Sequence, residues 1–535
     1  MAGARVSNVF AGLTRGVPGI APRDMAPPAA SFEDPARITQ ANSLRFEPHK
    51  LFLGVVGAQI ERTPNGERYA QGGAQIGVDD DRHALTIAGS RAGKGRSAII
   101  PNMLRYEGSV LAIDPKGELA LATAAARARL GQTVHVLDPF NTTGDALARF
   151  RTGFNPLTAM RSESAVEDAV LITDALVIPG TGDPHWDESA RTIIEGIVLE
   201  VASAARFEGK RNLATVRDLL AEGDQLDGTD AGKDSPSGMD MLEAFMRESH
   251  EPAVRRAAAD FFERPDRERD SVLSTARRHL RALSFPEIAG SLSQHGFELS
   301  DLKTAATTIY LCLPGRHMGT CGRWLRLFVN LALQAMERTS AFQGASPGQT
   351  AAGCPVLFVL DEFASLGHMR QIEDAAGQIA GYGVKLWPIL QDLGQLKALY
   401  RERWETFMGN AGVLQFFGNN DLTTLEWVSK RLGTTTIEQA SASNITPGAS
   451  KAGATGESYS PRTTAILEPD EIALVFGRAD PLLRQLIIRA GFAPMILQRA
   501  YYDKHDAFRE AQHEGQAPQF KSGLPRLAGL LGRSA

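Results

Sequence analysis

A glycine-rich loop between an apolar run and a helix-forming run constrains the fold of this chain more than any other feature. The run 84–88 reads ALTIA, and residues 98–104 have the composition of a helix. The loop between them consists of Gly89, Ser90, Arg91, Ala92, Gly93, Lys94 and Gly95. Backbone N–H groups of such a loop, together with the positive end of the helix dipole, can cradle a polyphosphate. The sequence therefore predicts a strand, a phosphate-binding loop and a helix in succession.

The loop departs at two positions from the general pattern GxxxxGK[ST]. Ala88 occupies the place of the first glycine, and Gly95 occupies the place of the hydroxyl residue that binds Mg²⁺. Lys94 occupies the lysine position, from which its ammonium reaches the β and γ phosphates of a nucleotide. We expect Lys94 to face solvent in the empty loop. A glycine-rich turn with a surface lysine is the alternative that this segment leaves open.

A buried strand that ends in two acids is the second motif. Residues 356–360 read VLFVL and are followed by Asp361 and Glu362. Ligands of parallel sheets bind at the carboxyl ends of the strands. Asp361 is therefore predicted to hold a magnesium ion, and Glu362 to polarise an attacking water as a general base. A strand that ends in a solvated acidic turn remains the alternative.

A third apolar run, 384–390, is followed by Gln391. If this strand lies next to 356–360, the amide of Gln391 would lie near the γ-phosphate and orient water. Gln391 as an ordinary polar residue at a strand end is equally compatible with the spacing. Pro388 lies inside this run, although proline lacks a ladder donor and is usually confined to edge strands or bulges.

The order of elements predicts an α/β fold with an inserted all-α domain. Apolar runs at 84–88, 109–113, 133–137, 308–313, 356–360 and 384–390 alternate with helical patterns, which indicates a parallel sheet with crossover connections. The predicted units are an N-terminal arm and lead-in (1–76), a first core part (77–160), the all-α insertion (161–302), a second core part (303–500) and a tail (501–535). Weak structure is expected at 16–34, at 439–461 and beyond residue 505.

Composition places the chain among ordinary globular proteins. Lys and Arg number 57 against 62 Asp and Glu, a net charge of −5, so any contact with nucleic acid must use a local basic surface. Three cysteines, Cys312, Cys321 and Cys354, form neither a disulfide framework nor a paired metal motif, which favours a reducing compartment. No run approaches the ~20 apolar residues of a membrane span. We therefore expect a cytoplasmic location.

Several motifs together resemble the coupling proteins of type IV secretion and conjugation systems, the TraG/TraD-like ATPases. The resemblance covers residues 77 to 500 and rests on motifs that follow one another in the family order: IAGSRAGKGRSAIIPNML, VLAIDPKGEL, VLDPF, GFNPL, HWDESARTIIEGI, PVLFVLDEFASLG, ILQDLGQL and FGNNDLTTLEWVSKRLGTTT. In that family the loop often ends Gly-Lys-Gly, so Gly95 agrees with it. Ser97 is then a candidate for the missing metal-binding hydroxyl.

The resemblance implies a RecA-like P-loop NTPase core that uses ATP and Mg²⁺ and assembles as a hexameric ring on DNA. It also implies delivery of a relaxase–DNA or protein substrate to the secretion channel. Family members usually begin with transmembrane helices. We therefore expect this chain either to belong to a soluble subset or to contact the inner membrane peripherally through a partner.

Two other functions remain open at this stage. One is a chromosomal DNA-pumping ATPase of the same fold, and the other is a docking receptor that binds nucleotide with little turnover. Glu362 favours an active motor, because a docking receptor has no need of a base.

The segment from 251 to 282 offers a weak indication of DNA binding. It carries eight arginines against six acids, and we expect a solvated helix face with ion pairs rather than a phosphate-binding surface. The arginines are Arg255, Arg256, Arg264, Arg267, Arg269, Arg277, Arg278 and Arg281.

Overall fold

A sheet of eleven strands forms the centre of the protein in the computed structural model. The structure describes residues 30–180, 182–222, 238–346, 348–443 and 456–509. The strand order is β4-β1-β15-β14-β11-β5-β10-β9-β6-β8-β7. The strands are β1 (Leu51–Val56), β4 (Ala74–Val78), β5 (His83–Ala88), β6 (Val110–Asp114), β7 (Thr133–Leu137), β8 (Thr307–Cys312), β9 (Val356–Leu360), β10 (Val384–Leu390), β11 (Ala411–Phe417), β14 (Arg484–Arg489) and β15 (Met495–Gln498).

The seven strands from β11 to β7 are parallel, and they include all six strands predicted from the sequence, with ends shifted by at most one residue. Parallel strands are covered on both faces, so they read as continuous apolar runs. Every residue of β5, β9 and β10 is buried. The α/β prediction is therefore confirmed, and the carboxyl ends of the strands that carry the motifs meet at one edge.

The other four strands are antiparallel and join the two ends of the chain to the sheet. β14 pairs with β11, β15 with β14, β1 with β15, and β4 with β1. The predicted boundary between residues 76 and 77 thus falls inside β4. Residues 501–508, predicted as tail, also pack on the core, because Phe508 is fully buried and Tyr502 is 6% exposed.

Pro388 lies in β10 in the middle of the sheet, not at an edge. It pairs in register with Leu360 of β9, and the ladder to β5 begins one residue later, at Ile389. The N–H of Leu386 faces β5 and donates to Nδ1 of His83 over 3.2 Å. Backbone N–H groups of successive residues point to opposite neighbouring strands, so the nitrogen of Pro388, like that of Leu386, faces β5. Pro388 lies one residue before the first paired residue of the β10–β5 ladder, Ile389. The missing donor therefore breaks no ladder bond.

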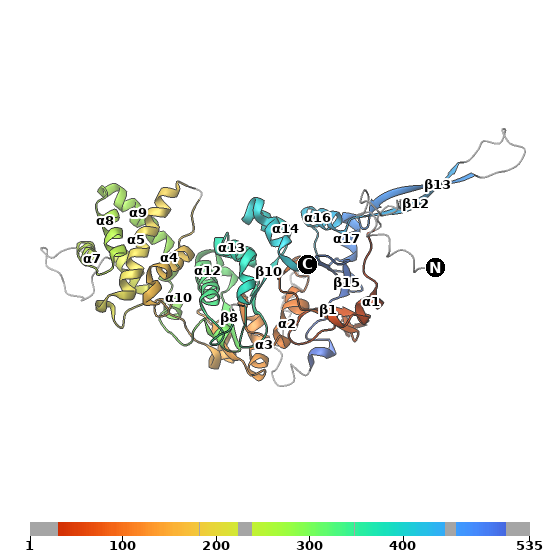
Figure 1. Cartoon of the computed structure of the whole chain (residues 1–535), viewed down its shortest axis with the longest axis horizontal. Helices are drawn as coiled ribbons and strands as arrows, with labels where there is room; N and C mark the ends of the chain where they lie inside the picture. The colour runs from red at the N-terminus through yellow and green to blue at the C-terminus, as the bar shows by residue number, and fades with distance from the viewer. Residues whose placement is uncertain (1–29, 181, 223–237, 347, 444–455, 510–535) are drawn as a thin grey trace, which may run out of the picture.

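All described elements between β7 and β8 are helical, and most form a lobe at one end of the molecule (Figure 1). The α-helices are α4 (Ala165–Leu176), α5 (Pro184–Ser203), α6 (Leu213–Glu222), α7 (Gly238–Arg247), α8 (Pro252–Phe262), α9 (Asp266–His279), α10 (Pro286–Ser291) and α11 (Asp301–Thr304). The helix α5 packs closely on α8, where a Cβ at Gly196 would lie 2.6 Å from Cβ of Ala257. Apolar residues at helical spacing, such as Ile193 and Ile197, fill the lobe.

The arginines of the segment 251–282 are largely engaged within the lobe. Arg264 contacts Asp260 and Glu268, and Arg269 contacts Asp266 over 2.8 Å. Arg277 donates to the last carbonyls of α6, those of Leu220 and Ala221. Arg255 and Arg278 also have partners, the carbonyl of Ser249 and the carboxylate of Asp187. The expectation of ion pairs is confirmed for Arg264, Arg269 and Arg278, whereas Arg255 and Arg277 donate to backbone carbonyls instead.

The remaining helices cover the sheet and its ends (Figure 1). They are α1 (Pro35–Gln40), α2 (Ile100–Arg105), α3 (Glu118–Arg129), α12 (Gly315–Arg338), α13 (Arg370–Gln378), α14 (Leu393–Tyr400), α15 (Trp404–Gly409), α16 (Leu422–Leu432) and α17 (Pro469–Val475). None of the helices in the described ranges has both the length and the apolar character that crossing a bilayer requires.

Two further hairpins lie outside the main sheet. One joins β2 (Gln59–Arg62) to β3 (Arg68–Gln71). The other joins β12 (Thr434–Ser443) to β13 (Gly456–Ala465) and projects from the body (Figure 1). The expectation of weak structure at 439–461 was therefore wrong for both strands, and residues 444–455 lie outside the described part. Of the predicted N-terminal arm, residues 16–29 lie outside it too.

Candidate functional site

A cavity of about 730 Å³ opens at the edge where β5, β10, β9 and β6 end. Its volume lies within the range of small-molecule sites. Eight residues predicted for the site line it: Ser90, Arg91, Gly93, Lys94, Gly95, Asp361, Glu362 and Gln391. Gly89 and Ala92 lie in the same loop but do not line the cavity.

Lys94 joins the two motifs that are far apart in the sequence. Its Nζ lies 3.1 Å from Oδ1 of Asp361 and 2.8 Å from Oε1 of Glu362. The side chain is 18% exposed, so the expectation that Lys94 faces solvent was wrong. Burial alone would lower the pKa of Lys94, but the two carboxylates outweigh it and raise the pKa. The ammonium of Lys94 therefore bridges the two carboxylates of the acidic pair.

The two acids of the pair differ in their electrostatics. Burial raises the pKa of Asp361, although the charge of Lys94 opposes the rise. Burial alone would also raise the pKa of Glu362, but the hydrogen bond and charge of Lys94, together with the Gln391 amide, lower it overall. Glu362 is the more exposed of the two, at 34% against 15% for Asp361. Glu362 is thus ionised and accessible from the cavity.

Glu362 is held in an unusual backbone conformation, with φ of 51° and ψ of 42° in the left-handed region. It caps a short 3-10 helix, Phe363–Leu366, and its N–H donates to Oδ1 of Asp361 over 3.0 Å. Such a conformation costs about 1–2 kcal/mol for a residue with a Cβ. It directs the carboxylate of Glu362 toward Lys94 and Gln391.

Gln391 follows β10 and contacts Glu362, which follows β9. The two strands are neighbours in the sheet, as predicted. Its Nε2 donates to Oε2 of Glu362 over 3.2 Å. Its own N–H donates to the side chain of Gln395, and its carbonyl accepts from Nδ2 of Asn419. The backbone of Gln391 is therefore held by α14 and by the segment after β11, and its side-chain amide is held by Glu362.

Close backbone packing explains the glycine at position 89. A Cβ at Gly89 would overlap the carbonyl oxygen of Gly418 at the end of β11, and a Cβ at Gly418 would overlap Cβ of Ala92. Gly93 has a φ of 90°, which favours glycine. The loop thus takes its shape from β11 as well as from its own sequence.

Arg499 braces the loop from inside the protein. It is fully buried, and its guanidinium donates to the carbonyls of Ala92 (2.8 Å), Gly477 (3.4 Å) and Leu483 (3.3 Å). Burial lowers its pKa. The sequence analysis missed this residue, because burial of a single arginine leaves no sequence pattern.

The helix after the loop begins with a π-helical turn, Gly95–Ile99. Within it, the hydroxyl of Ser97 donates to the carbonyl of Gly93 over 2.9 Å, and Ser97 is 1% exposed. Ser97 does not line the cavity. The structure therefore does not support Ser97 as the metal-binding hydroxyl.

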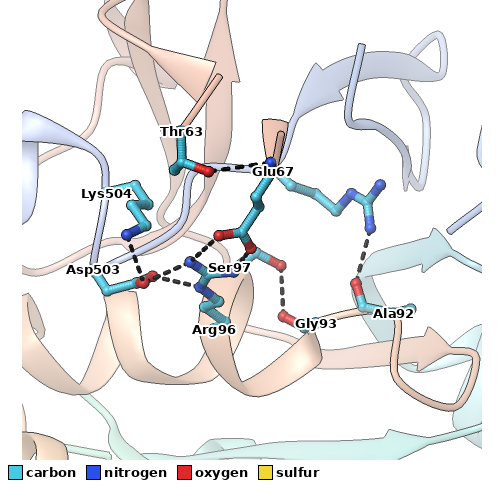
Figure 2. A network of polar contacts seen from close by, with 9 residues as sticks. Thr63, Glu67, Ala92, Gly93, Arg96, Ser97, Asp503 and Lys504 are labelled. Atoms are coloured by element: carbon cyan, nitrogen blue, oxygen red, sulfur yellow. Dashed lines mark hydrogen bonds and ion pairs between the residues drawn. The ribbon is translucent and has the colours of Figure 1, made fainter. Parts of the chain in front are cut away.

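Arg96, in the helical turn after the loop, contacts Glu67 beside β3 and Asp503 near the end of the described residues (Figure 2). Its guanidinium makes two 2.5 Å bonds to Asp503, contacts Glu67, and stacks 4.4 Å from the ring of Tyr501. Glu67, Arg96, Tyr502 and Asp503 line the cavity at this end. Sequence reasoning missed the cluster, because its members come from residues far apart in the chain.

The end of β6 contributes a buried acid to the same cavity. Asp114 is 1% exposed, and burial raises its pKa to about 7. Its Oδ2 accepts from the N–H of Ala120 over 2.9 Å. The turn that follows Asp114 places Lys116 on the cavity wall.

The donor set fits a nucleotide with a magnesium ion. The described residues contain no group of three or more His, Cys, Asp or Glu side chains arranged to hold a metal. Magnesium is commonly held by one or two carboxylates together with substrate phosphates, and Asp361 at the cavity supplies such a carboxylate.

The sequence matches, over residues 47–523, the family described as type IV secretory system conjugative DNA transfer. A conjugal transfer protein TraG of Escherichia coli is 29% identical over 468 residues, which cover 83% of this chain and 71% of the relative. The VirD4 protein of Rhizobium radiobacter is 25% identical over 442 residues, which cover 80% of this chain and 58% of the relative.

Two solved structures of the bacterial conjugative coupling protein TrwB have the same fold. The unbound form of its N-terminally shortened variant superposes with a TM-score of 0.59 at 15% identity, covering 90% of this chain and 95% of the other. The complex of TrwB with the non-hydrolysable ATP analogue ADPNP gives a TM-score of 0.58 at 14% identity, covering 90% and 96%. At this identity the likeness establishes the RecA-like fold.

Proposed function

Since this chain belongs to the type IV secretory system conjugative DNA transfer family, we propose that it is an ATP-hydrolysing coupling protein. It recruits a relaxase–DNA or protein substrate and delivers it to a secretion channel. The observation that carries the proposal is the convergence of Lys94, Asp361, Glu362 and Gln391 on one cavity.

Each residue of the site has a distinct role in this proposal. The backbone of residues 89–95 and the ammonium of Lys94 bind the phosphates of ATP. Asp361 holds Mg²⁺, which neutralises charge on the phosphates when it is bound. Glu362 takes a proton from the attacking water, and Gln391 orients Glu362 and that water.

Nucleotide binding also changes the state of Glu362. Lys94 contacts Glu362 over 2.8 Å in the structure, and anionic phosphates compete for the same ammonium. Transfer of Lys94 to the phosphates removes the hydrogen bond that lowers the pKa of Glu362. The carboxylate then becomes more basic when the substrate is present, which suits a general base.

The assembly belongs to the proposal as well. We infer a core made of residues 77–160 and 303–500 that is interrupted by the all-α unit 161–302, and a homo-hexameric ring around DNA. The strands β1 and β4 and the segment 501–508 extend that core. The chain acts at the cytoplasmic side of the inner membrane and contacts the membrane through a partner.

A docking receptor with little turnover is the second candidate, and a chromosomal DNA-translocating ATPase is the third. Family membership favours conjugative transfer over the third. The accessible and ionised Glu362 favours turnover over the second.

The test compares ATP hydrolysis by the full chain and by Lys94→Ala, with and without DNA. We expect the variant to lose most hydrolysis while its far-ultraviolet circular dichroism stays unchanged. Equal hydrolysis by both proteins would refute the ATPase assignment. Sizing with ATP and DNA then tests the ring, and a monomer under every condition would favour the docking receptor.

A further inference from the structure

Lys116 is a second lysine on the wall of the nucleotide cavity, besides Lys94. It lies in the turn after β6, and its side chain is exposed. Its charge acts on Glu362 and adds to the effect of Lys94 in lowering the pKa of that carboxyl. Among the described residues its side chain has no hydrogen bond or ion pair, whereas Lys94 is held by two carboxylates.

The turn that carries Lys116 is rigid. The buried carboxylate of Asp114 accepts from the N–H of Ala120 over 2.9 Å, and the carbonyl of Asp114 accepts from the N–H of Gly117 over 3.4 Å. Gly117 has a φ of 70°, and a Cβ there would lie 3.0 Å from the side chain of Thr143. The backbone of Lys116 is thus fixed while its ammonium remains available to a ligand.

The order of strands places the two lysines on opposite sides of Glu362. Lys94 follows β5 and Lys116 follows β6, and between these strands lie β10 and β9, which carry Gln391 and the acidic pair. In the proposed function the terminal phosphate lies nearest to Glu362, because the attacking water lies between them. An ammonium on the β6 side can therefore approach the terminal phosphate from the side opposite to Lys94, which reaches the β and γ phosphates.

We propose that Lys116 contacts the terminal phosphate of the bound nucleotide and makes the site distinguish a nucleoside triphosphate from a diphosphate. This inference rests on the proposed function of the same cavity. The ammonium of Lys116 is exposed, and no ion pair within the described residues has to break when it binds a ligand. A charge-assisted hydrogen bond to phosphate is among the stronger polar contacts.

The experiment measures binding of ADPNP and of ADP, each with Mg²⁺, to the full chain. Lys116→Ala is expected to weaken ADPNP binding about tenfold and to change ADP binding less than about twofold. Lys116→Arg is expected to restore most of the ADPNP affinity. Lys430→Ala, at an exposed lysine in the last turn of α16, is the control and should alter neither affinity.

The outcomes separate this inference from the function on which it rests. Equal weakening of ADPNP and ADP binding would overturn it, since that result indicates a general effect of charge. Unchanged affinity for both would overturn it too. If Lys94→Ala abolishes hydrolysis while Lys116→Ala has no effect, the inference fails and the ATPase assignment stands. If Lys94→Ala leaves hydrolysis intact, the proposed function itself fails.

Thermal melting of Lys116→Ala should match the parent, because the side chain has no partner to lose among the described residues.

Discussion

Gln391 donates to Oε2 of Glu362 over 3.2 Å while Lys94 lies 2.8 Å from Oε1 of the same carboxylate. Each oxygen of Glu362 therefore has one protein donor, and the carboxylate, 34% exposed, keeps further lone pairs that can accept from water in the cavity. A ligand that attracts Lys94 removes one of these donors, so catalysis and substrate binding are linked through this carboxylate.

Glu362→Gln should bind ATP and Mg²⁺ but hydrolyse ATP about 10²–10⁴-fold more slowly, because Asp361 is retained and only the base is lost. Nucleotide binding by fluorescence and steady-state hydrolysis together check this prediction. If binding disappears along with activity, Glu362 is a metal ligand or a structural residue instead.

Gln391→Ala should lower kcat by about 10–100-fold with a smaller change in KM, because the amide orients Glu362 rather than binding the nucleotide. Combining it with Glu362→Gln should add little further loss, since the two residues act through one carboxylate. Fully additive losses in the double variant would contradict this coupling.

Gly95→Ser should be tolerated, because a Cβ at this position meets no atom within 4 Å. The new hydroxyl stands where the general loop pattern has its magnesium ligand, so the Mg²⁺ concentration that supports half-maximal hydrolysis should fall. Gly89→Ala is the contrasting variant. Its Cβ would overlap the carbonyl of Gly418, so it should lose nucleotide binding. Equal behaviour of the two variants would argue against the described packing of the loop.

His83 should make the protein less stable in mild acid. Burial, followed by the nearby charge of Lys385, lowers the pKa of His83 from 6.5 to about 4, and its Nδ1 must stay unprotonated to accept from Leu386. The unfolded chain then binds a proton that the folded chain does not. The contribution of neutral His83 to the free energy of unfolding is therefore fully present above pH 6.5. It is lost as the pH falls toward 4, and this loss lowers the free energy of unfolding by up to about 3 kcal/mol.

His83→Asn keeps an acceptor for Leu386 without the titration. Denaturant unfolding of this variant between pH 7 and 4.5 should show a flatter dependence on pH than the parent. Parallel profiles for the two proteins would show that another group governs the acid sensitivity.

The parallel half of the sheet and most of the site could be predicted from the sequence, for a physical reason. Strands buried on both faces read as apolar runs, and their carboxyl ends must meet at one edge. Lys94, Asp361, Glu362 and Gln391 follow such runs, so their convergence could be expected.

The antiparallel half could not be predicted in this way. The strand β1 is as apolar as β9, but nothing local indicates that Val55 pairs with Gln498 at the far end of the chain. The contacts of Arg96 and Arg499 likewise depend on partners about 400 residues away. The exposure of Lys94 was also misjudged, because the sequence does not give the distance between the loop and the acidic pair.

The position of β5 between β10 and β11 has a consequence for synthesis of the chain. Translation proceeds from the amino terminus, so the phosphate loop leaves the ribosome roughly 300 residues before either neighbour of its strand. Until then an apolar strand has two unpaired edges, and closing contacts of such long separation is slow. A nascent chain that stops before Phe417 carries the complete loop sequence without the sheet that gives the loop its shape.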